Sequence, residues 1–344
     1  MSRPPLSILY LGTLDGTSLD RSRAIQRLGH TVHHIDLRRL LPQTPWMYRI
    51  TWKIGGQVFA PWILRRLPKA MQGRRYDVCL VDSGEWVTPR IIELVRRHAN
   101  KVANYVIDDP FGARDVARFR AYRRSLSSYD LCVVVRPDNA REAERAGARR
   151  VLRVFMSSDE VTHAPRLLTE EDHRQWDAEV LFLGTWFPER GPFLLRLLEL
   201  GVPLSIRGSN WNKAPEWPAL QAAWKGGPIA GDDYAKAIEC TRVNIGLLSK
   251  GNRDLHTTRS LEIPALGGLL CAERTSEHLA MYTEGVEALF WSDAEECAAA
   301  CRLALSDETR RREIAAAGQV RNIANQIRNE NVMDEILTRV LVDS

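Results

Sequence analysis

Short apolar runs alternate with helical segments through the first half of the chain, and this alternation limits the possible folds more than any other feature. We predict strands at residues 7–12, 77–82, 102–107 and 131–135, with a further strand entered through residues 29–32. Helical periodicity fills the segments between them, at residues 18–28, 89–98 and 139–146. Five strands that alternate with helices predict a parallel, doubly wound α/β sheet.

The second half repeats this pattern after a polar, proline-containing connection at residues 156–179. We predict strands at residues 180–184, 204–207, 243–248, 269–271 and 288–291 and helices near residues 192–200, 218–224 and 232–239. A charged helical tail follows at residues 308–317 and 320–341. Because 344 residues suit about two domains, we expect two Rossmann-like sheets.

Composition is that of a globular protein, with 44% apolar and 26% charged residues. No apolar run approaches the ~20 residues that span a bilayer, and no signal-peptide pattern opens the chain. We therefore expect a cytoplasmic protein, with a peripheral position at the inner face of the membrane as an alternative. The six cysteines lack metal-site spacing; Cys297 and Cys301 lie one helical turn apart, and we interpret both as packing residues with no metal.

The segment from His256 to Glu273 combines phosphate-binding and ribose-binding chemistry at one corner of the second half. Hydroxyls and a guanidinium precede a short helical turn that contains Glu262, and a Gly-Gly pair and an apolar strand follow. Helix N-termini favour anions, and an acidic residue can accept from sugar hydroxyls. This order favours a nucleotide-diphosphate site, whereas an ordinary capped helix with an ion-paired glutamate is the alternative.

The same segment resembles the nucleotide-binding corner of GT-B glycosyltransferases, most closely that of the CgeB-like (spore maturation protein) branch. This chain has Leu261 where that branch usually has phenylalanine. Further resemblances follow in order along nearly the whole chain, at residues 17–21, 28–32, 106–111, 159–165, 182–185, 207–211 and 233–236. The resemblance implies a GT-B fold of two Rossmann-like domains that face a central cleft. The implied domains are an acceptor-side domain at residues 1–165, a nucleotide-sugar-binding domain at 166–325 and a helix at 326–344 that packs back towards the first domain.

Donor-binding residues are predicted by the corner and by the resemblance together. They are Gly184, Thr185, Arg190, Arg207, His256, Thr257, Thr258, Arg259 and Glu262. Arginines and aimed donors at the β-phosphate would stabilise the departing nucleotide diphosphate. The chain has no Asp-x-Asp sequence, so we expect transfer without a metal, no cofactor, and a nucleotide-diphosphate sugar, UDP-type by assumption, as donor substrate.

Three residues are predicted to act in catalysis: Asp108, Asp109 and Arg190. An inverting enzyme needs a base for the acceptor's proton, and Asp108 is our choice. Asp109 precedes a proline and is therefore the better cap for the following turn. Arg190 would bind the diphosphate, although an exposed surface arginine remains the alternative at this position.

Residues 38–75 carry nine lysines and arginines and no acidic residue, interleaved with aromatic residues, whereas the formal charge of the whole chain is only +5. Such a segment is typical of surfaces that bind anionic membranes or a lipid-linked acceptor, and less so here of nucleic-acid-binding surfaces. Packing of the aromatic residues onto the first sheet is an equal alternative.

The function predicted from the sequence is glycosyl transfer from a nucleotide-diphosphate sugar to an unidentified acceptor. A GT-B-fold sugar-nucleotide epimerase and a non-catalytic nucleotide- or polyanion-binding module are the alternatives. No Gly-x-Gly-x-x-Gly follows a predicted strand, which argues against a nicotinamide enzyme.

Overall fold

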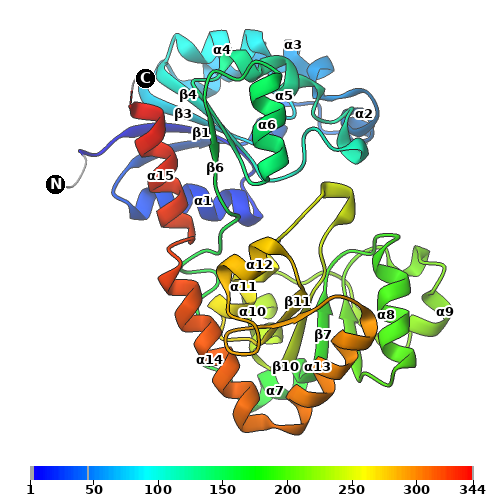
Figure 1. The fold of residues 1–344 in the computed structure, drawn as a ribbon. Coiled ribbons are helices and arrows are strands. Elements are labelled where there is room, and N and C mark those ends of the chain that lie inside the picture. The colour runs from blue at the N-terminus through cyan, green and yellow to red at the C-terminus, as the bar shows by residue number, and fades with distance from the viewer. Residues whose placement is uncertain (1–3, 45, 343–344) are drawn as a thin grey trace. The chain divides into compact units, whose positions relative to one another are not determined.

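The structure, a computed structural model, describes residues 4–44 and 46–342. The chain forms two compact units (Figure 1). Unit 1 contains the chain up to Phe155, residues 251–253 and the segment from Asn329 onward; unit 2 contains Met156–Lys250 and Asp254–Arg328. Each unit holds one six-stranded parallel sheet, which confirms the predicted fold class of two Rossmann-like α/β domains.

The sheet of unit 1 has the strand order β2-β1-β3-β4-β5-β6. Its strands are β1 Ser7–Leu11, β2 Thr31–Ile35, β3 Tyr76–Asp82, β4 Ala99–Val106, β5 Leu131–Val134 and β6 Val151–Arg153. Its helices are α1 Gly16–Arg27, α2 Trp46–Ile54, α3 Ala60–Met71, α4 Pro89–Arg96, α5 Arg120–Ser125, α6 Pro137–Arg145 and α15 Asn329–Leu341, with 3₁₀ turns η1 Leu37–Leu40, η2 Gly56–Phe59, η3 Ala113–Asp115 and η4 Leu126–Ser128. The order reverses between β1 and β3, so ligands are expected beyond the carboxyl ends of these two strands.

The sheet of unit 2 has the order β12-β11-β10-β7-β8-β9, and its reversal lies between β7 and β10. Its strands are β7 Ala178–Leu183, β8 Leu204–Arg207, β9 Trp224–Gly226, β10 Thr241–Gly246, β11 Leu270–Glu273 and β12 Leu289–Trp291. Its helices are α7 Glu170–Trp176, α8 Arg190–Glu199, α9 Trp217–Leu220, α10 Gly231–Glu239, α11 Arg259–Ala265, α12 Ser276–Met281, α13 Ala294–Ser306 and α14 Glu308–Ala324, with the 3₁₀ turn η5 Trp211–Lys213. The 3₁₀ turn η6 Lys250–Asn252 begins in unit 2 and continues into residues 251–253 of unit 1.

Helix α15 belongs to unit 1 although it ends the chain. It contacts α1, β4 and β5, and its apolar face is buried at Val332, Met333, Ile336, Leu337 and Val340. Fully burying an aliphatic side chain stabilises the folded state by about 1.5–3 kcal/mol, so this face ties the tail firmly to the first sheet. The predicted return of the last helix to the N-terminal domain is confirmed.

Three details of the sequence prediction are wrong. Strand β6 was not predicted, and Trp224, expected in a helix, begins β9 instead; both strands are three-residue edge strands, too short for a period of two to stand out. The tail breaks at residues 325–328 rather than at residues 318–319. Gly318 does not interrupt α14, because its missing side chain lets the helix approach the carbonyl oxygen of Glu287, which a Cβ atom would meet at 2.3 Å.

The cysteine pair of α13 is buried, as expected of packing residues, and a third cysteine lies beside it. Cys271 of β11 lies beside Cys297 and Cys301, and the three buried sulfur atoms lie within 4.8 Å of one another. The sequence offered no third cysteine near the pair because strand and helix meet only in the folded core. Within residues 4–44 and 46–342, every helix is too short or too polar to span a bilayer.

Candidate functional site

A hollow in unit 2 lies beyond the carboxyl ends of β7 and β8. Four predicted donor residues line it, Gly184, Thr185, Arg207 and Arg259, together with Leu183, Gly208, Pro228, Ile229 and Tyr234. The lining therefore holds two arginines and no carboxylate. Strand β7 is one of the two strands at the reversal of sheet order, where such folds usually bind ligands, and the two arginines give the hollow the charge of an anion site.

The backbone of this hollow is fixed by close contact between two loops. Gly208 has φ +146°, and a Cβ atom there would lie 2.0 Å from the carbonyl oxygen of Gly184. That carbonyl accepts a hydrogen bond from Nε1 of the buried Trp211 at 2.9 Å. Glycine at 208 is thus required both by φ and by space, and the loop that carries Thr185 is held in place.

Glu262 lies at the centre of a buried polar cluster behind the hollow. Its carboxylate accepts from the hydroxyl of Tyr234 at 2.6 Å and from Nη1 of Arg259 at 3.0 Å, and His163 Nε2 lies at 3.6 Å. Burial alone would raise the pKa of this carboxyl group, but Arg259, His163 and the hydrogen bonds hold the pKa below its ordinary value. Glu262 is therefore an oriented carboxylate within the protein.

Arg259 connects this cluster to the hollow. Its guanidinium lies 5.0 Å from the ring centre of Tyr234 and donates to Thr258 Oγ1 at 3.1 Å as well as to Glu262. The side chain is 36% exposed, so part of it faces solvent while the rest is held. An arginine that is both oriented and accessible suits recognition of a phosphate.

Arg190 is the first residue of α8 and spans the reversal point of the sheet. Its guanidinium donates to the carbonyl oxygen of Thr185 at 2.9 Å and to those of Leu247 and Leu248 at 3.2 and 3.4 Å. It also lies 4.6 Å from the ring centre of Phe187. The side chain is buried, which differs from the surface arginine that the sequence left open. Three backbone carbonyl oxygens thus orient the Arg190 guanidinium between the ends of β7 and β10.

The rest of the predicted corner forms the start of a short helix. His256 is buried and uses both ring nitrogens inside the protein, one accepting from the Met156 N–H at 2.9 Å and the other bonded to Glu277. The backbone N–H of Thr257 donates to Ser260 Oγ at 3.1 Å. In this arrangement His256 holds the chain and offers no free nitrogen to a ligand, whereas Thr258 stays beside Arg259.

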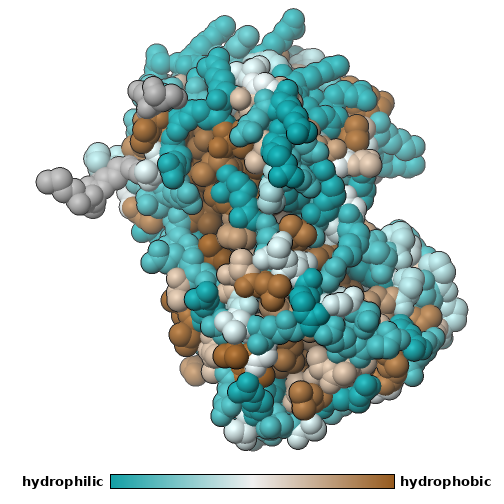
Figure 2. Space-filling model, in the orientation of Figure 1, coloured by the Kyte–Doolittle hydropathy of each residue, from teal (hydrophilic) through white to brown (hydrophobic). Residues whose placement is uncertain are grey.

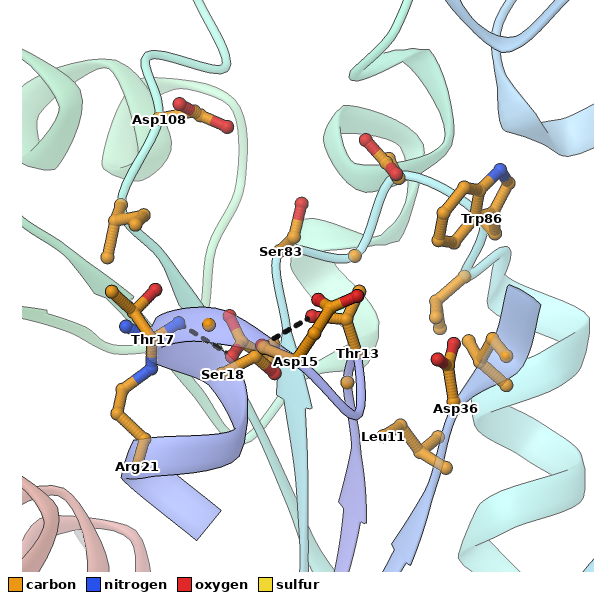
Figure 3. Close-up of a pocket in the computed structure, with 18 of the residues that line it drawn as sticks. Leu11, Thr13, Asp15, Thr17, Ser18, Arg21, Asp36, Ser83, Trp86 and Asp108 are labelled. Atoms are coloured by element: carbon orange, nitrogen blue, oxygen red, sulfur yellow. Dashed lines mark hydrogen bonds and ion pairs between the residues drawn. The ribbon is translucent and has the colours of Figure 1, made fainter. Parts of the chain in front are cut away.

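Unit 1 has its own pocket at the same end of its sheet, beyond β1, β3 and β4 (Figure 3). Arg21 and Thr17 lie on one side of it, and Trp86 and Asp36 on the other (Figure 3). The charged residues of its lining are Asp15, Asp36, Asp82, Glu85, Asp108, Arg21 and Arg118. With five carboxylates and two arginines, this pocket repels anions and offers many acceptors to hydroxyl groups.

Arg21 and Asp82 form a buried ion pair at the base of the pocket. Asp82 Oδ2 accepts from Arg21 Nη2 at 2.7 Å and from the hydroxyl of Tyr10 at 2.6 Å, and the Arg21 guanidinium lies 5.1 Å from the ring centre of Tyr105. Burial and the neighbouring carboxylate both raise the pKa of Tyr10, so its hydroxyl stays protonated as a donor. The Asp82 carboxylate is thus fixed by two hydrogen bonds, one from Arg21 and one from Tyr10.

Asp108 belongs to a second charged cluster on the pocket wall. Arg118 donates from Nη1 to Asp108 Oδ2 at 2.9 Å and pairs through Nε with Glu85. Burial raises the pKa of Glu85, although Arg118 opposes the shift, and Asp108 and Asp115 add to it. The sequence predicted Asp108; it did not predict Glu85, which follows β3 without any motif to mark it.

Asp109 has the capping role expected of it. Its Oδ1 accepts from the backbone N–H groups of Phe111 and Gly112 at 3.1 and 2.8 Å and from Asn139 Nδ2 at 2.8 Å. The side chain is buried and does not line the pocket of unit 1. The turn after β4 thus positions Asp108 through the hydrogen bonds of its neighbour.

Two residues of the Glu262 cluster were missed as site residues, although both lie in segments that carry the family resemblance. Tyr234 comes from α10, and His163 comes from the segment of unit 2 before α7, which the sequence suggested to be a connection. The His163 ring is oriented by the Asp159 N–H, which donates to Nδ1 at 2.8 Å. A histidine two residues before a proline in a polar connection carries no signal of burial, so only the fold reveals its place.

Residues 190–338 match the family described as glycosyl transferase-like. Among solved structures, sucrose-phosphate synthase from Thermosynechococcus elongatus is similar with a TM-score of 0.69 at 13% identity, over 97% of this chain and 98% of that one. Anabaena HepE in complex with UDP-glucose is similar with a TM-score of 0.65 at 12% identity, over 97% and 100% of the two chains. A glycosyltransferase from Rickettsia africae gives 0.60 at 11%, over 99% and 100%. A search of curated proteins gave no match.

Proposed function

We propose that this chain is a GT-B glycosyltransferase of the CgeB-like group and that it moves a sugar from a nucleotide-diphosphate donor to a hydroxyl acceptor. The matched segment at residues 190–338 and the two-sheet architecture support this proposal. The observation that carries the proposal is the arginine-lined hollow of unit 2 beside the oriented Glu262 carboxylate. UDP is the nucleotide to test first, since the similar Anabaena protein was solved with UDP-glucose.

On the donor side, each half of a nucleotide diphosphate has a matching group. The Glu262 carboxylate would accept from the ribose hydroxyls, with Tyr234 and His163 orienting it. Arg259 would bind the phosphates from the hollow, and Arg190 would stabilise the charge that develops on the leaving diphosphate. Fixed donors aimed at developing charge make the largest protein contribution in reactions of this kind.

On the acceptor side, the pocket of unit 1 suits a hydroxyl-rich, uncharged molecule. Its carboxylates would accept hydrogen bonds from acceptor hydroxyls, and Glu85 or Asp108 would take the proton of the attacking one. We favour Glu85 of the two, because burial raises its pKa and a stronger base takes a hydroxyl proton more readily. Asp108 would then hold Arg118 in place.

We further propose that transfer needs no divalent metal. Arg190 and Arg259 would supply the positive charge that a metal ion supplies in other transferases. Among the described residues, two groups have the spacing of metal ligands, Cys271–Cys297–Cys301 and His173–Asp177–Cys240, and neither lines the hollow of unit 2 or the pocket of unit 1. Activity that is lost in EDTA and restored by Mg²⁺ would contradict this part.

The proposal is tested first by binding. A ligand that binds only the folded state raises the melting temperature by mass action, so a thermal-shift screen across nucleoside diphosphates should give a clear stabilisation by one of them. The Glu262→Ala variant should fold and lose that shift. If no nucleoside diphosphate binds, or if the variant binds as the wild type does, the donor site is wrongly assigned.

Turnover then separates the proposal from its alternatives. A transferase releases nucleotide from its sugar donor, slowly to water and faster when an acceptor is supplied. An epimerase would convert the donor sugar with no acceptor present, and a binding module would bind without releasing nucleotide. Chromatography of the nucleotide and sugar products from a donor panel distinguishes the three.

A further inference from the structure

Helices α2 and α3 of unit 1 expose large aromatic side chains. Trp46 is 47% exposed, Trp52 49% and Trp62 41%. Figure 2 shows apolar residues among hydrophilic ones at the position that Figure 1 gives to α2. Tryptophan side chains left in water on neighbouring helices mark an interaction surface more often than a single exposed apolar residue does. The packing alternative left open by the sequence accounts for Phe59 and Met47, which are buried, but not for these three.

The same helices carry unopposed positive charge. On α3, Trp62, Arg65, Arg66 and Lys69 recur at helical spacing and are exposed, whereas the opposite face of the helix is buried in the core of unit 1. In α2, Arg49 and Lys53 are exposed in the same way. Within residues 4–44 and 46–342, no carboxylate pairs with Arg49, Lys53, Arg65 or Lys69.

The two helices form one continuous surface. The ring of the buried Phe59 lies 6.5 Å from the ring centre of Trp46 and 6.2 Å from that of Trp62, so the starts of α2 and α3 are held together. The end of α2 and the following 3₁₀ turn η2 add two exposed aliphatic residues, Ile54 at 48% and Val58 at 39%. We call this set, Trp46, Arg49, Lys53, Ile54, Val58, Trp62, Arg65 and Lys69, the α2–α3 surface.

This surface adjoins the pocket of unit 1. Trp86 of the pocket lining donates from Nε1 to Thr51 Oγ1 of α2 at 3.1 Å. Arg118, which holds Glu85 and Asp108 on the pocket wall, lies with its guanidinium 4.8 Å from the ring centre of Trp52. Helix α2 therefore packs directly against two of the side chains that line the pocket.

We propose that the α2–α3 surface docks onto an anionic lipid bilayer. Basic side chains are attracted to anionic headgroups, and tryptophans prefer the boundary between headgroups and acyl chains. Ile54 and Val58 favour a bilayer over a nucleic acid, because an aliphatic side chain can enter the acyl region but cannot stack on a base in the way that aromatic rings do. The surface thus combines charge complementarity with an insertable apolar turn.

Docking would bring the pocket of unit 1 beside the headgroups. The acceptor would then be a hydroxyl-bearing molecule attached to the membrane, such as a glycolipid headgroup, rather than a free sugar. This step rests on the proposed function, whereas docking itself does not.

Vesicle flotation with the full chain tests the docking. The protein should float with vesicles that contain an anionic phospholipid and remain behind with phosphatidylcholine vesicles, and added salt should weaken the binding. The Arg65→Glu/Lys69→Glu variant should bind anionic vesicles at least about 30-fold more weakly. Arg23→Glu/Arg90→Glu is the matched control, because it changes the net charge by the same amount at exposed residues of the same unit and should bind as the wild type does.

The apolar part has its own pair of variants. Trp46→Ser/Trp62→Ser should lose vesicle binding that persists in salt, whereas Leu303→Ser/Val320→Ser, at two side chains that are 68% exposed in unit 2, should not. Melting curves of each variant check that it is folded. The nucleotide thermal shift should stay unchanged in all four.

Three results would overturn the inference: no binding to anionic vesicles at low salt, equal losses in the test and control variants, or an oligonucleotide that binds more tightly than the vesicles do. These failures are distinct from failure of the proposed function. A chain that floats but binds no nucleotide sugar would dock without being a transferase, and a transferase that does not float would refute the docking alone.

Discussion

The two sheets each place an arginine across their reversal point, but the arginines bond to different kinds of group. In unit 1, Arg21 from the first helix meets the carboxylate of Asp82 at 2.7 Å. In unit 2, Arg190 from the corresponding helix donates to three backbone carbonyls. The same position in the same architecture therefore holds an arginine bonded to a carboxylate in unit 1 and an arginine bonded to backbone carbonyls in unit 2.

This difference teaches how one fold can serve two kinds of ligand. In unit 2, the arginines Arg190 and Arg259 near the strand ends suit a diphosphate. In unit 1, the carboxylates of the pocket disfavour an anion and suit hydroxyl groups. The assignment of donor to unit 2 and acceptor to unit 1 depends on side chains at these strand ends, not on the sheets. Substitutions at the strand ends can therefore break the comparison.

The largest effect is expected at the acidic pocket, from Glu85→Gln. If Glu85 takes the acceptor's proton, kcat should fall by about 10²–10⁴-fold while the dissociation constant for the nucleotide stays unchanged. The wild-type kcat/KM should also fall on the acid side at a pH above about 4.3, the ordinary pKa of a glutamate, because burial raises the pKa of Glu85 and only its ionised form accepts a proton. Steady-state kinetics across pH measure both.

Asp115→Asn is the matched control for Glu85. Asp115 is buried, lies 3.9 Å from the same arginine and has a raised pKa, but it does not line the pocket. Equal losses of kcat in the two variants would mean that Glu85 only positions Arg118, and an unchanged acid limb in Glu85→Gln would lead to the same conclusion.

Removal of the neutralising carboxylate in unit 1 should cost stability next. Asp82→Asn leaves Arg21 buried without its partner, and breaking a buried ion pair from one side costs about 3–5 kcal/mol. Urea unfolding measures the loss. Asp138→Asn removes an exposed partner of Arg141 in the same unit and should cost at most about 1 kcal/mol. Comparable losses would show that the Arg21–Asp82 pair is not the buried anchor described above.

In unit 2, Arg190→Lys should lower kcat/KM by about 10²–10³-fold, because a lysine cannot reach three carbonyls and a leaving phosphate with one ammonium group. Arg196→Lys on the exposed face of the same helix is the control, since Arg196 pairs only with Glu199 and Glu295 at the surface. Nucleotide-sugar kinetics with a melting curve for each variant separate catalysis from folding. Two variants with wild-type rates would make Arg190 a purely structural residue.

The fold could be predicted from the sequence because its signals are local. The apolar runs that form β1, β3 and β10 and the helical periods between them need no tertiary information, and the corner at residues 256–273 carries its own order of residues. Strands β6 and β9 could not be found, since three residues at a sheet edge bury too little to leave a pattern. Gly318 misled the prediction because a close helix approach looks the same in sequence as a helix end.

The candidate site was predictable only in part, for a related reason. Arg190, Arg259 and Glu262 follow strands or lie in a motif, so their place at the strand ends could be expected. Their partners come from elsewhere in unit 2: Tyr234 from α10 and His163 from the segment before α7. Glu85 could not be predicted either, because a glutamate after a strand is common in sequences and only its burial in the fold marks it as a site residue.

The smallest effect is expected from Glu262→Gln, which tests whether the nucleotide contacts the oriented carboxylate of unit 2. The amide keeps the shape but weakens the acceptor, so the dissociation constant for the nucleoside diphosphate should rise by about 10–150-fold, the value of a hydrogen bond to a charged group. Isothermal titration measures it. Tyr234→Phe, which removes only the orienting hydroxyl, should cost less; equal losses would mean that the carboxylate orients Tyr234 rather than contacting the nucleotide.

The pH dependence of stability gives a second, ligand-free readout of Glu262. Its pKa is held below the ordinary value of about 4.3 in the folded state, so the group stabilises the wild type fully above that pH and progressively less as the pH falls through the lowered pKa. The Glu262→Gln variant lacks this titration, and the difference in unfolding free energy between the two proteins should therefore shrink below about pH 4.3. A difference that stays constant through this range would mean that Arg259 and Tyr234 do not stabilise the ionised carboxylate, and the nucleotide would then have to organise the cluster when it binds.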